Sequence, residues 1–199
     1  MSANNRICLS GNIVDEPSWR YSCYGRAYYS FSLQVKRLSS NVDILPVHMN
    51  QELRQPFIRP DSAAFVEGEI RTCNREVEGK KRLIIYVHAR RLYAKEIESR
   101  NEVYLRGRLC KAPVKRFTPF GKEIADALIA VMRANGKFDY IPLILWGKNA
   151  RRIIAVPVGS IIEIDGRMQS REYVKQYENG AAEKRIALEV SVLTLNQIT

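Results

Sequence analysis

Apolar and polar side chains alternate with a period of two along several stretches of the chain. Residues 102–110, EVYLRGRLC, place Val103, Leu105 and Leu109 on one side and arginines on the other. Residues 27–35, AYYSFSLQV, alternate in the same way. Because successive side chains of a strand point to opposite faces, both stretches predict strands with one buried face.

A long hairpin and one helix are predicted in the second half. The hairpin covers residues 160–195, and its turn is expected at Glu178, Asn179 and Gly180, because Asn and Gly tolerate the positive φ of a tight reversal. Residues 148–156, KNARRIIAV, predict a helix that ends before Pro157, since the residue before a proline disfavours helical backbone.

The chain contains an internal repeat. Residues from Asn5 onward match residues from Asn101 onward at a constant offset of 96, and the offset grows only between predicted strands. The matched pairs are Asn5 and Asn101, Leu9 and Leu105, Gly11 and Gly107, Pro17 and Pro113, Gly25 and Gly121, Arg37 and Arg133, and Pro46 and Pro142. We therefore predict two domains, residues 1–96 and 99–199, joined by a short charged segment.

Five short strands with a helix between the third and fourth are typical of an OB-type barrel. The predicted fold is therefore all-β, with two tandem five-stranded OB barrels that each carry one short helix at that position. The sequence "FDYIPLILWGK", residues 138–148, is the expected third strand of the second barrel.

This strand has two different faces. Ile141, Leu143 and Leu145 form an aliphatic face suited to a core, whereas Tyr140 and Trp146 lie on the opposite face. Trp146 would then be offered to a ligand, although a tryptophan half-buried under a loop or at a subunit contact would give the same pattern.

The net charge of the chain restricts the expected class of ligand. The net charge is +11 and the isoelectric point about 9.7, which favours polyanions and nucleic acid first. No basic amphipathic helix suited to a membrane surface is visible. The basic side chains expected at a binding surface of the second half are Arg106, Arg108, Lys111, Lys115, Arg116, Lys148, Arg167 and Arg171.

The sequence contains no recognisable catalytic or metal-binding motif. The four cysteines have no CxxC spacing, and only His48 and His88 could join them, so neither a zinc site nor a cofactor is expected. Paired carboxylates, a Cys/His dyad and a phosphate-binding glycine loop are also missing, so we expect no enzyme. With no secretory signal and no membrane span, the expected location is the cytoplasm.

The second half resembles the bacterial single-stranded DNA-binding protein family over nearly its whole length. The residues that carry the resemblance are NEVYLRGRL, Pro113, RFTPFGK, DYIPLILWGK, VGSIIEIDGRMQSREY and NGAAEKRIALEVSV. The resemblance implies OB barrels that wrap single-stranded DNA without catalysis. It also implies that Trp146, Tyr140 and Tyr173 stack on bases, with Phe138 as the nearest match to a fourth stacking aromatic.

The first half departs from the family pattern. Ile44, Asn50 and Arg75 stand where the second half has Tyr140, Trp146 and Tyr173. The first half would either bind through charge and displaced aromatics, or serve mainly as a scaffold. Its candidate contacts are Tyr28, Arg37 and Arg75.

Two further expectations follow from the resemblance. Family members mostly assemble four barrels, so two barrels in one chain predict a homodimer, with exposed first strands and long hairpins as contact surfaces. Family chains usually close with a glycine-rich linker and an acidic tip that recruits partners, whereas this sequence ends at LTLNQIT, directly after the last predicted strand.

The expected function is therefore sequence-nonspecific binding of single-stranded DNA in replication, recombination, repair or transfer of a mobile element. Base stacking and phosphate neutralisation would supply the affinity. The alternative is a replication-restart accessory or scaffold that acts mainly through protein contacts, because a fold alone does not decide function. RNA remains an alternative ligand, since no residue pattern tests for the 2′-hydroxyl.

Overall fold

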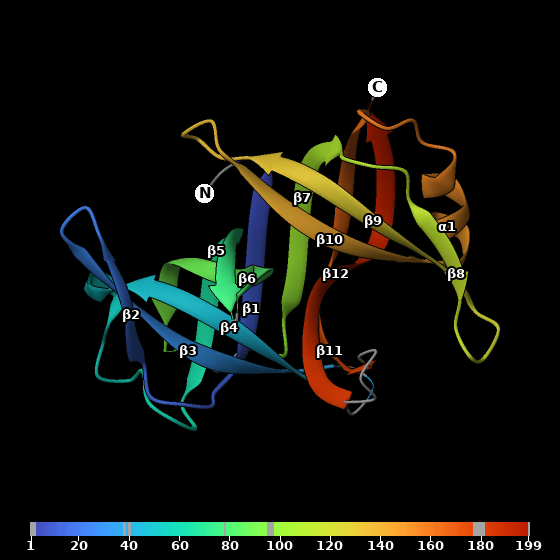
Figure 1. Ribbon diagram of the computed structural model, residues 1–199. Helices are drawn as coiled ribbons and strands as arrows, with labels where there is room; N and C mark the ends of the chain where they lie inside the picture. Colours follow the sequence, from blue (N-terminus) through green and yellow to red (C-terminus); the bar gives the residue numbers. More distant parts are fainter. Residues whose placement is uncertain are drawn as a thin grey trace.

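The computed structural model describes residues 3–37, 39, 41–77, 79–94, 98–176 and 182–198, and the chain folds mostly into β-strands. Figure 1 shows the first half in blue to green and the second in yellow to red. The elements of the first half are β1 (Asn5–Ile13), β2 (Ser18–Cys23), β3 (Arg26–Lys36), β4 (Val42–Asn50), the 3₁₀ turn η1 (Gln51–Leu53), β5 (Ala63–Val77) and β6 (Lys80–Tyr93).

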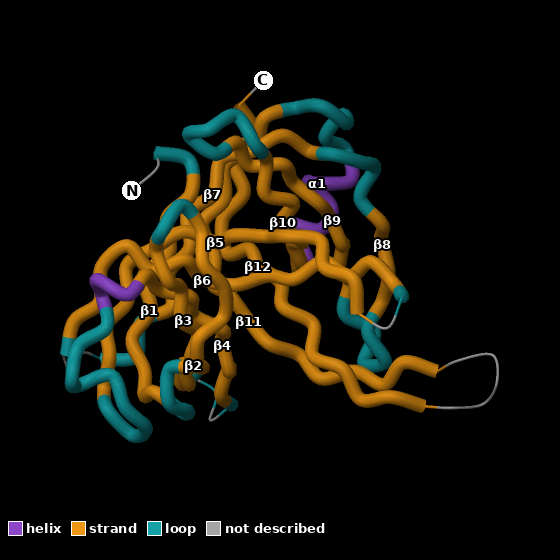
Figure 2. The backbone as a smooth tube through the Cα atoms, turned by 60° about the vertical axis from the view of Figure 1, so that its left-hand side comes forward, coloured by secondary structure: helices purple, strands orange, loops and turns teal. Residues whose placement is uncertain are grey.

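The second half repeats this order. Its elements are β7 (Asn101–Leu109), β8 (Val114–Phe117), β9 (Glu123–Met132), β10 (Phe138–Trp146), α1 (Gly147–Ile154), β11 (Ile161–Gln176) and β12 (Ala182–Ile198). The β11–β12 hairpin is long and extends away from the rest of the half in Figure 2. Its predicted turn at Glu178, Asn179 and Gly180 lies outside the described residues, as do residues 95–97 of the linking segment.

Five strands of each half close into a ring. In the first half β1 pairs with both β5 and β3, β3 with β4, and β4 with β6 in parallel; β7, β9, β10, β12 and β11 repeat these pairings. Gly11 and Gly107 lie where each ring closes. A Cβ atom on Gly11 would stand 2.1 Å from the carbonyl oxygen of Gln34, so only glycine fits there.

The interior of each ring is filled as the alternation predicted. On β10, Ile141, Leu143 and Leu145 are fully buried, and on β3 the same is true of Leu33 and Val35. Burial of these branched side chains on one face of each strand is the main driving force for the fold.

The first strands of the two halves pair with each other. β1 and β7 run antiparallel, with Ile7 opposite Val103 at the centre and Asn5 and Leu9 opposite Leu105 and Asn101. Ile7 and Val103 are equivalent in the repeat, so a pseudo-twofold axis passes between them and exchanges the two flanking pairs. The two strands lie side by side in Figure 1. The prediction that the first strands are exposed edges was therefore wrong, because each edge is already satisfied within the chain.

Two buried aspartates extend the contact between the halves. Asp139 is fully buried, binds the guanidinium of Arg133, and accepts hydrogen bonds from the guanidinium of Arg71 at 2.8 Å and the backbone N–H of Thr72 at 2.6 Å. Arg133 in turn donates to the carbonyl oxygen of Thr72 at 2.7 Å. The second half is thus tied to strand β5 of the first.

In the equivalent contact the first half supplies the buried carboxylate and the second half supplies the backbone groups. Asp43 is fully buried, pairs with Arg37, and accepts from the backbone N–H of Ser170 at 2.7 Å. Arg37 donates to the carbonyl oxygen of Ser170 at 3.0 Å. Because Arg37, Asp43 and Ser170 match Arg133, Asp139 and Thr72 in the repeat, the two contacts obey the same pseudo-twofold symmetry.

Two local predictions require correction. Each half has six strands rather than five, because the expected second strand is preceded by a short strand, β2 or β8. In the first half, Tyr24 and Gly25 make the reversal between β2 and β3 with φ of 48° and 71°. The predicted helix of the first half is only the three-residue turn η1, since Pro56 and Pro60 interrupt the segment that follows it.

Removing one inter-half carboxylate tests the importance of this contact. We expect Asp139→Ala to lower the free energy of unfolding by about 3–5 kcal/mol, because it leaves a partly buried guanidinium without its partner. Urea unfolding followed by circular dichroism measures the change. Asp165→Ala, at an exposed carboxylate, is the matched control and should stay within about 0.5 kcal/mol of the parent protein; equal losses in the two variants would contradict the expectation.

Candidate nucleic-acid interface

The outward face of the second half carries exposed aromatic side chains. Trp146, Tyr140 and Tyr173 are 40%, 45% and 36% exposed. In the strand register Tyr140 lies opposite Ala130 and Trp146 opposite Ile124, so neighbouring strands place small or aliphatic groups beside the rings. The face therefore offers flat aromatic surface with little above it.

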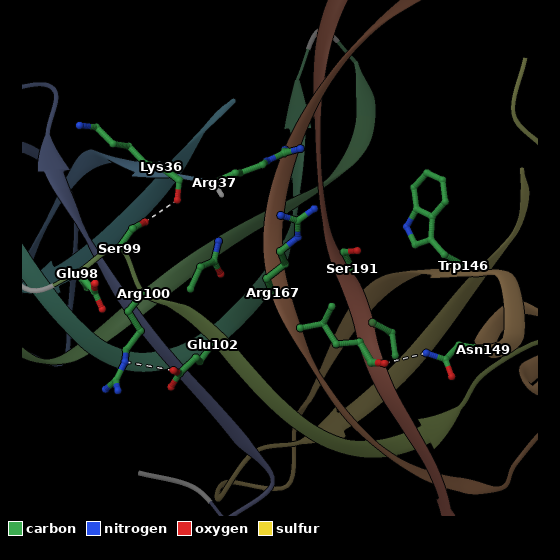
Figure 3. A pocket seen from close by; sticks show the side chains of 13 residues that line it. Lys36, Arg37, Glu98, Ser99, Arg100, Glu102, Trp146, Asn149, Arg167 and Ser191 are labelled. Carbon is green, nitrogen blue, oxygen red and sulfur yellow. Dashed lines mark hydrogen bonds and ion pairs between the residues drawn. The ribbon is translucent and has the colours of Figure 1, made fainter. Parts of the chain in front are cut away.

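A cleft of about 860 Å³ adjoins Trp146. Its walls come from both halves: Lys36 and Arg37 from the end of β3, and Trp146, Arg167 and Ser191 from β10, β11 and β12. Figure 3 shows Trp146 on one side of the cleft and Lys36 on the other, with Arg167 between them. The side-chain amide of Asn149 donates to the carbonyl oxygen of Leu193 at 2.9 Å, which fastens α1 to β12 beside the indole.

A second recess lies on the same ring, beyond Tyr140. Phe138, 45% exposed, borders a pocket of about 520 Å³ together with Arg106 and Arg108. Arg108 donates to the carbonyl oxygen of Gly159, and Nε of Arg106 lies 3.6 Å from a carboxylate oxygen of Glu163. These three predicted residues are therefore close together, but they lie around the ring from Trp146.

The predicted basic residues differ in how far their charge is already neutralised. Four are held by acidic neighbours: Arg106 by Glu163 at 3.6 Å, Lys115 by Glu123 at 2.6 Å, Arg116 by Asp126 at 2.9 Å, and Arg171 by Glu189 at 3.5 Å. Hydrogen bonds from Lys115 and Arg151 lower the pKa of the Glu123 carboxyl, which keeps that site ionised.

Lys148 and Arg167 form no ion pair with an acidic side chain in the described ranges of the chain. Lys148 is exposed two residues after Trp146, and Arg167 lines the Trp146 cleft. Arg171, although paired, also lies over the ring of Tyr173, 5.7 Å from its centre. Cationic groups thus accompany two of the exposed aromatics.

The three candidates of the first half have different environments. Arg37 is held by Asp43 and Ser170 and also lines the Trp146 cleft, so its predicted contact with a ligand stays a prediction. Tyr28 is half-buried and stacks on Tyr21, with ring centres 4.8 Å apart. Arg75 is exposed, and it lines a small pocket with other side chains of this half.

An aromatic layer that the sequence analysis did not predict covers the outward face of the first half. His48 of β4 stacks on Tyr86 of β6 at 3.9 Å, and Tyr28 lies 6.0 Å from His88. Burial lowers the pKa of both His48 and His88 to about 4, and Arg20 and Arg90 act in the same direction on His48 and His88 respectively. The alternation in β4 could have indicated that His48 lies on the outward face, since Ile44 and Pro46 share its face of the strand.

Exposed aromatics also occur at the hairpin β8–β9, where Phe117 and Phe120 are largely exposed, and at Trp19 on β2. The RFTPFGK stretch contains both phenylalanines. Their exposure could not be predicted, because it depends on the additional strand β8.

Among the described residues, no three His, Cys, Asp or Glu side chains gather closely enough to hold a metal ion. No helix in these ranges has the length and apolarity that a membrane crossing requires.

Comparison with known proteins identifies the second half. Residues 100–197 match the sequence model of the Single-strand binding protein family. This half of the chain belongs to that family. Among curated proteins, the single-stranded DNA-binding protein of Bacillus cereus is 37% identical over 83 residues, which is 38% of this chain and 49% of that protein. Single-stranded DNA-binding protein 3 of Listeria innocua is 39% identical over 80 residues, or 37% and 50% of the two chains.

The chain spans about half the length of these curated relatives. A likeness over the whole chain comes from solved structures. The wild-type single-stranded DNA binding protein from Thermus aquaticus superposes with a TM-score of 0.78 at 22% identity, covering 98% of this chain and 93% of that one. At this identity the likeness shows the fold alone.

Two histidines, the buried His48 and the half-buried His88, predict how stability depends on pH. Their folded pKa of about 4 lies below the value of about 6.5 expected on unfolding, so the unfolded chain binds more protons. Stability should therefore be full above pH 6.5 and decrease as the pH falls from there toward 4.

At pH 5.5 the expected loss is about 1 kcal/mol per histidine relative to pH 7.5, measured by urea unfolding. Replacing His48 and His88 together by Phe should flatten the profile between pH 7.5 and 5.5, above the range where carboxylates titrate. An unchanged slope in this double variant would show that other groups are responsible.

Proposed function

We propose that this chain binds single-stranded DNA without sequence preference and without catalysis. The observation that carries the proposal is the exposed aromatic face of the second half, where Trp146 and Arg167 line one cleft. Arg167 forms no ion pair with an acidic side chain in the part of the chain that the structure describes. Every base has a π-face, so stacking tolerates any sequence, and each stacked base contributes about 1–3 kcal/mol. The curated relatives, which are named single-stranded DNA-binding proteins, support the same function.

We infer that the interface extends around the ring of the second half. Tyr140 and Tyr173 would stack on bases, and Phe138 would do so where Arg106 and Arg108 accompany it. Lys148 and Arg167 would neutralise phosphates. Arg106, Lys115, Arg116 and Arg171 would contribute less because acidic neighbours already hold them.

The domain division belongs to the same proposal. We infer two OB-type barrels, residues 1–96 and 99–199, and the closed ring of five strands in each half supports the assignment. The second has α1 between its third and fourth ring strands, and the first has only η1. A role of the protein in replication, recombination or repair would follow from its binding of single-stranded DNA. The accessory or scaffold alternative is not favoured by the names of the relatives.

We propose that two chains associate, which would bring four barrels together. Apolar side chains support this on the long hairpin, where Val174 and Ile186 are more than half exposed. Sedimentation velocity should give about twice the chain mass of 22.9 kDa, and Ile186→Lys should shift the protein toward the monomer. A monomer at all concentrations would contradict the proposed association.

Removal of the stacking rings tests the function. Trp146→Ala combined with Tyr173→Ala should weaken binding to oligo(dT) by several kcal/mol in total, at about 1–3 kcal/mol per lost stack. Trp19→Ala is the matched control, because Trp19 is exposed on β2 of the other half, away from this face. Fluorescence titration or anisotropy at fixed salt measures the affinities.

The same titration with single-stranded DNA, double-stranded DNA and RNA of equal length separates the ligand classes. A preference for the single strand of less than about tenfold would contradict strand binding as the function. Unchanged affinity in the Trp146 and Tyr173 double variant would reject the stacking face, even if the chain binds DNA by charge.

A further inference from the structure

The four cysteines of the chain differ in their surroundings. Cys8 and Cys110 are half-buried, and burial raises the pKa of both thiols. Because the thiolate is the reactive form of cysteine, these two side chains are poor nucleophiles. Cys23 and Cys73 are exposed, so the first half presents two thiols to solvent.

Of these two exposed cysteines, Cys73 lines a pocket and Cys23 does not. The pocket has a volume of about 310 Å³, and its other walls include Arg20, Tyr21, His48, Arg75 and Tyr86. Cys23 lies at the end of β2, opposite Arg26 in the strand register. Nε of Arg26 is already 3.8 Å from a carboxylate oxygen of Glu52. The surroundings of Cys73 are therefore those of a candidate ligand site, and those of Cys23 are not.

The aromatic walls of this pocket are held in place by their own contacts. The hydroxyl groups of Tyr21 and Tyr86 hydrogen bond to each other, and His48 stacks on Tyr86 with ring centres 3.9 Å apart. Burial raises the pKa of Tyr86, and the neighbouring Cys73 acts in the same direction, so the thiol lies close to this ring. A ligand bound at the thiol would meet walls that need no ordering.

One buried polar atom in the wall has no partner. His48 is only 7% exposed, and its Nδ1 makes no hydrogen bond within the part of the chain that the structure describes. Burial, helped by the charge of Arg20, lowers the pKa of His48 to about 4, so the imidazole is neutral at pH 7. An unpaired buried polar atom is costly, and a neutral polar group of a ligand would satisfy it.

Two arginines add a preference for negative charge. Arg20 and Arg75 are exposed at the pocket, and neither forms an ion pair with an acidic side chain in the described ranges. The equivalent of Arg20 in the second half, Arg116, is paired with Asp126, whereas the first half has Ser30 at the position of that aspartate. Guanidinium groups without an acidic partner suit the carboxylates of a small ligand.

An exposed thiol beside carboxylate-binding groups suits a ligand that carries both sulfur and carboxylates. We propose that Cys73 is a site of reversible modification by a low-molecular-weight disulfide that bears carboxylates. Its carboxylates would lie on Arg20 and Arg75, and an amide or amine would lie at Nδ1 of His48. The pocket volume is at the lower end of the range for small-ligand sites, which suits one half of such a disulfide.

The proposed step is a thiol–disulfide exchange. Cys73 gives its proton to solvent, and its thiolate attacks one sulfur of the disulfide. The bond between the two ligand sulfurs breaks, and a bond forms between Sγ of Cys73 and the attacked sulfur. The other half of the disulfide leaves as a thiolate and takes up a proton, so Cys73 is oxidised and the departing half is reduced. This inference goes beyond strand binding and does not depend on it.

Exposure of the full chain to excess oxidised glutathione near neutral pH tests the site. Mass spectrometry of the peptides should find one glutathionyl group on Cys73, formed at least about fivefold faster than on Cys23. Cys73→Ser should remove this modification, and the matched control Cys23→Ser should retain it at the parent rate. Equal rates at the two cysteines, or an internal disulfide between them, would overturn the proposal.

Carboxylate recognition is tested with two disulfides of different charge. Arg75→Ala should slow the reaction of Cys73 with oxidised glutathione about fivefold, the range of one exposed ion pair. The reaction with uncharged 2-hydroxyethyl disulfide should stay within about twofold, because it has no carboxylate to lose. Arg59→Ala, at an exposed arginine outside the pocket, should change neither rate. An equal loss with both disulfides would show that Arg75 acts on the thiol and would overturn the recognition of carboxylates.

A further variant isolates the unpaired nitrogen. His48→Phe keeps a ring against Tyr86 and removes Nδ1. At a fixed ratio of reduced to oxidised glutathione, it should lower the ratio of modified to free Cys73 about threefold, the range of one hydrogen bond. His88→Phe, at a histidine that does not line the pocket, should leave this ratio unchanged, and circular dichroism shows that both variants fold. An unchanged ratio in folded His48→Phe would overturn the role of Nδ1, and a parent protein whose Cys73 stays unmodified would overturn the site.

Discussion

The buried carboxylates of Asp43 and Asp139 are the constraint on which the rest of the molecule depends. A charge removed from water is tolerated only when it is paired and hydrogen-bonded, and each of these carboxylates obtains part of its partners from the opposite half. Neither half can therefore satisfy its own aspartate alone. Together with the β1–β7 pairing, the two contacts hold the halves in one orientation.

This shared scaffold allows the outward faces to differ. The interior of each ring and the residues around the pseudo-twofold axis repeat closely, whereas the opposite side of the same strands is unconstrained by packing. In the second half those positions carry separate, exposed rings next to cations. In the first half they carry tyrosines and histidines that stack on one another and leave only a small pocket open.

Much of the fold could be predicted from the sequence. Alternation identified the core side of β3, β7 and β10, and the constant offset of 96 identified the duplication. The outward placement of Tyr140 and Trp146 followed from the same period of two. The face of a strand that a side chain occupies is decided by its position along that strand. A local pattern in the sequence is therefore enough to predict it.

Partners across the fold could not be predicted in this way. The interpretation of Arg37 as a ligand contact was reasonable for an arginine after a strand, but its environment is decided by Asp43 and by Ser170 of the other half. The stacking of His48 on Tyr86 depends likewise on the parallel pairing of β4 with β6, which no local pattern encodes. The sequence signal for these contacts was that the pair Arg37 and Asp43 recurs in the second half as Arg133 and Asp139.

The unlike faces have a consequence for direction. A nucleic-acid strand has a 5′ and a 3′ end, and a pair of identical halves related by a twofold axis would present the same surface to it whichever way it ran. In this chain the pseudo-twofold axis relates separate, exposed rings in one half to rings that stack on one another in the other half. A strand that spans both halves therefore meets the two surfaces in a different order when it is reversed, so the molecule has a built-in polarity that its backbone symmetry lacks.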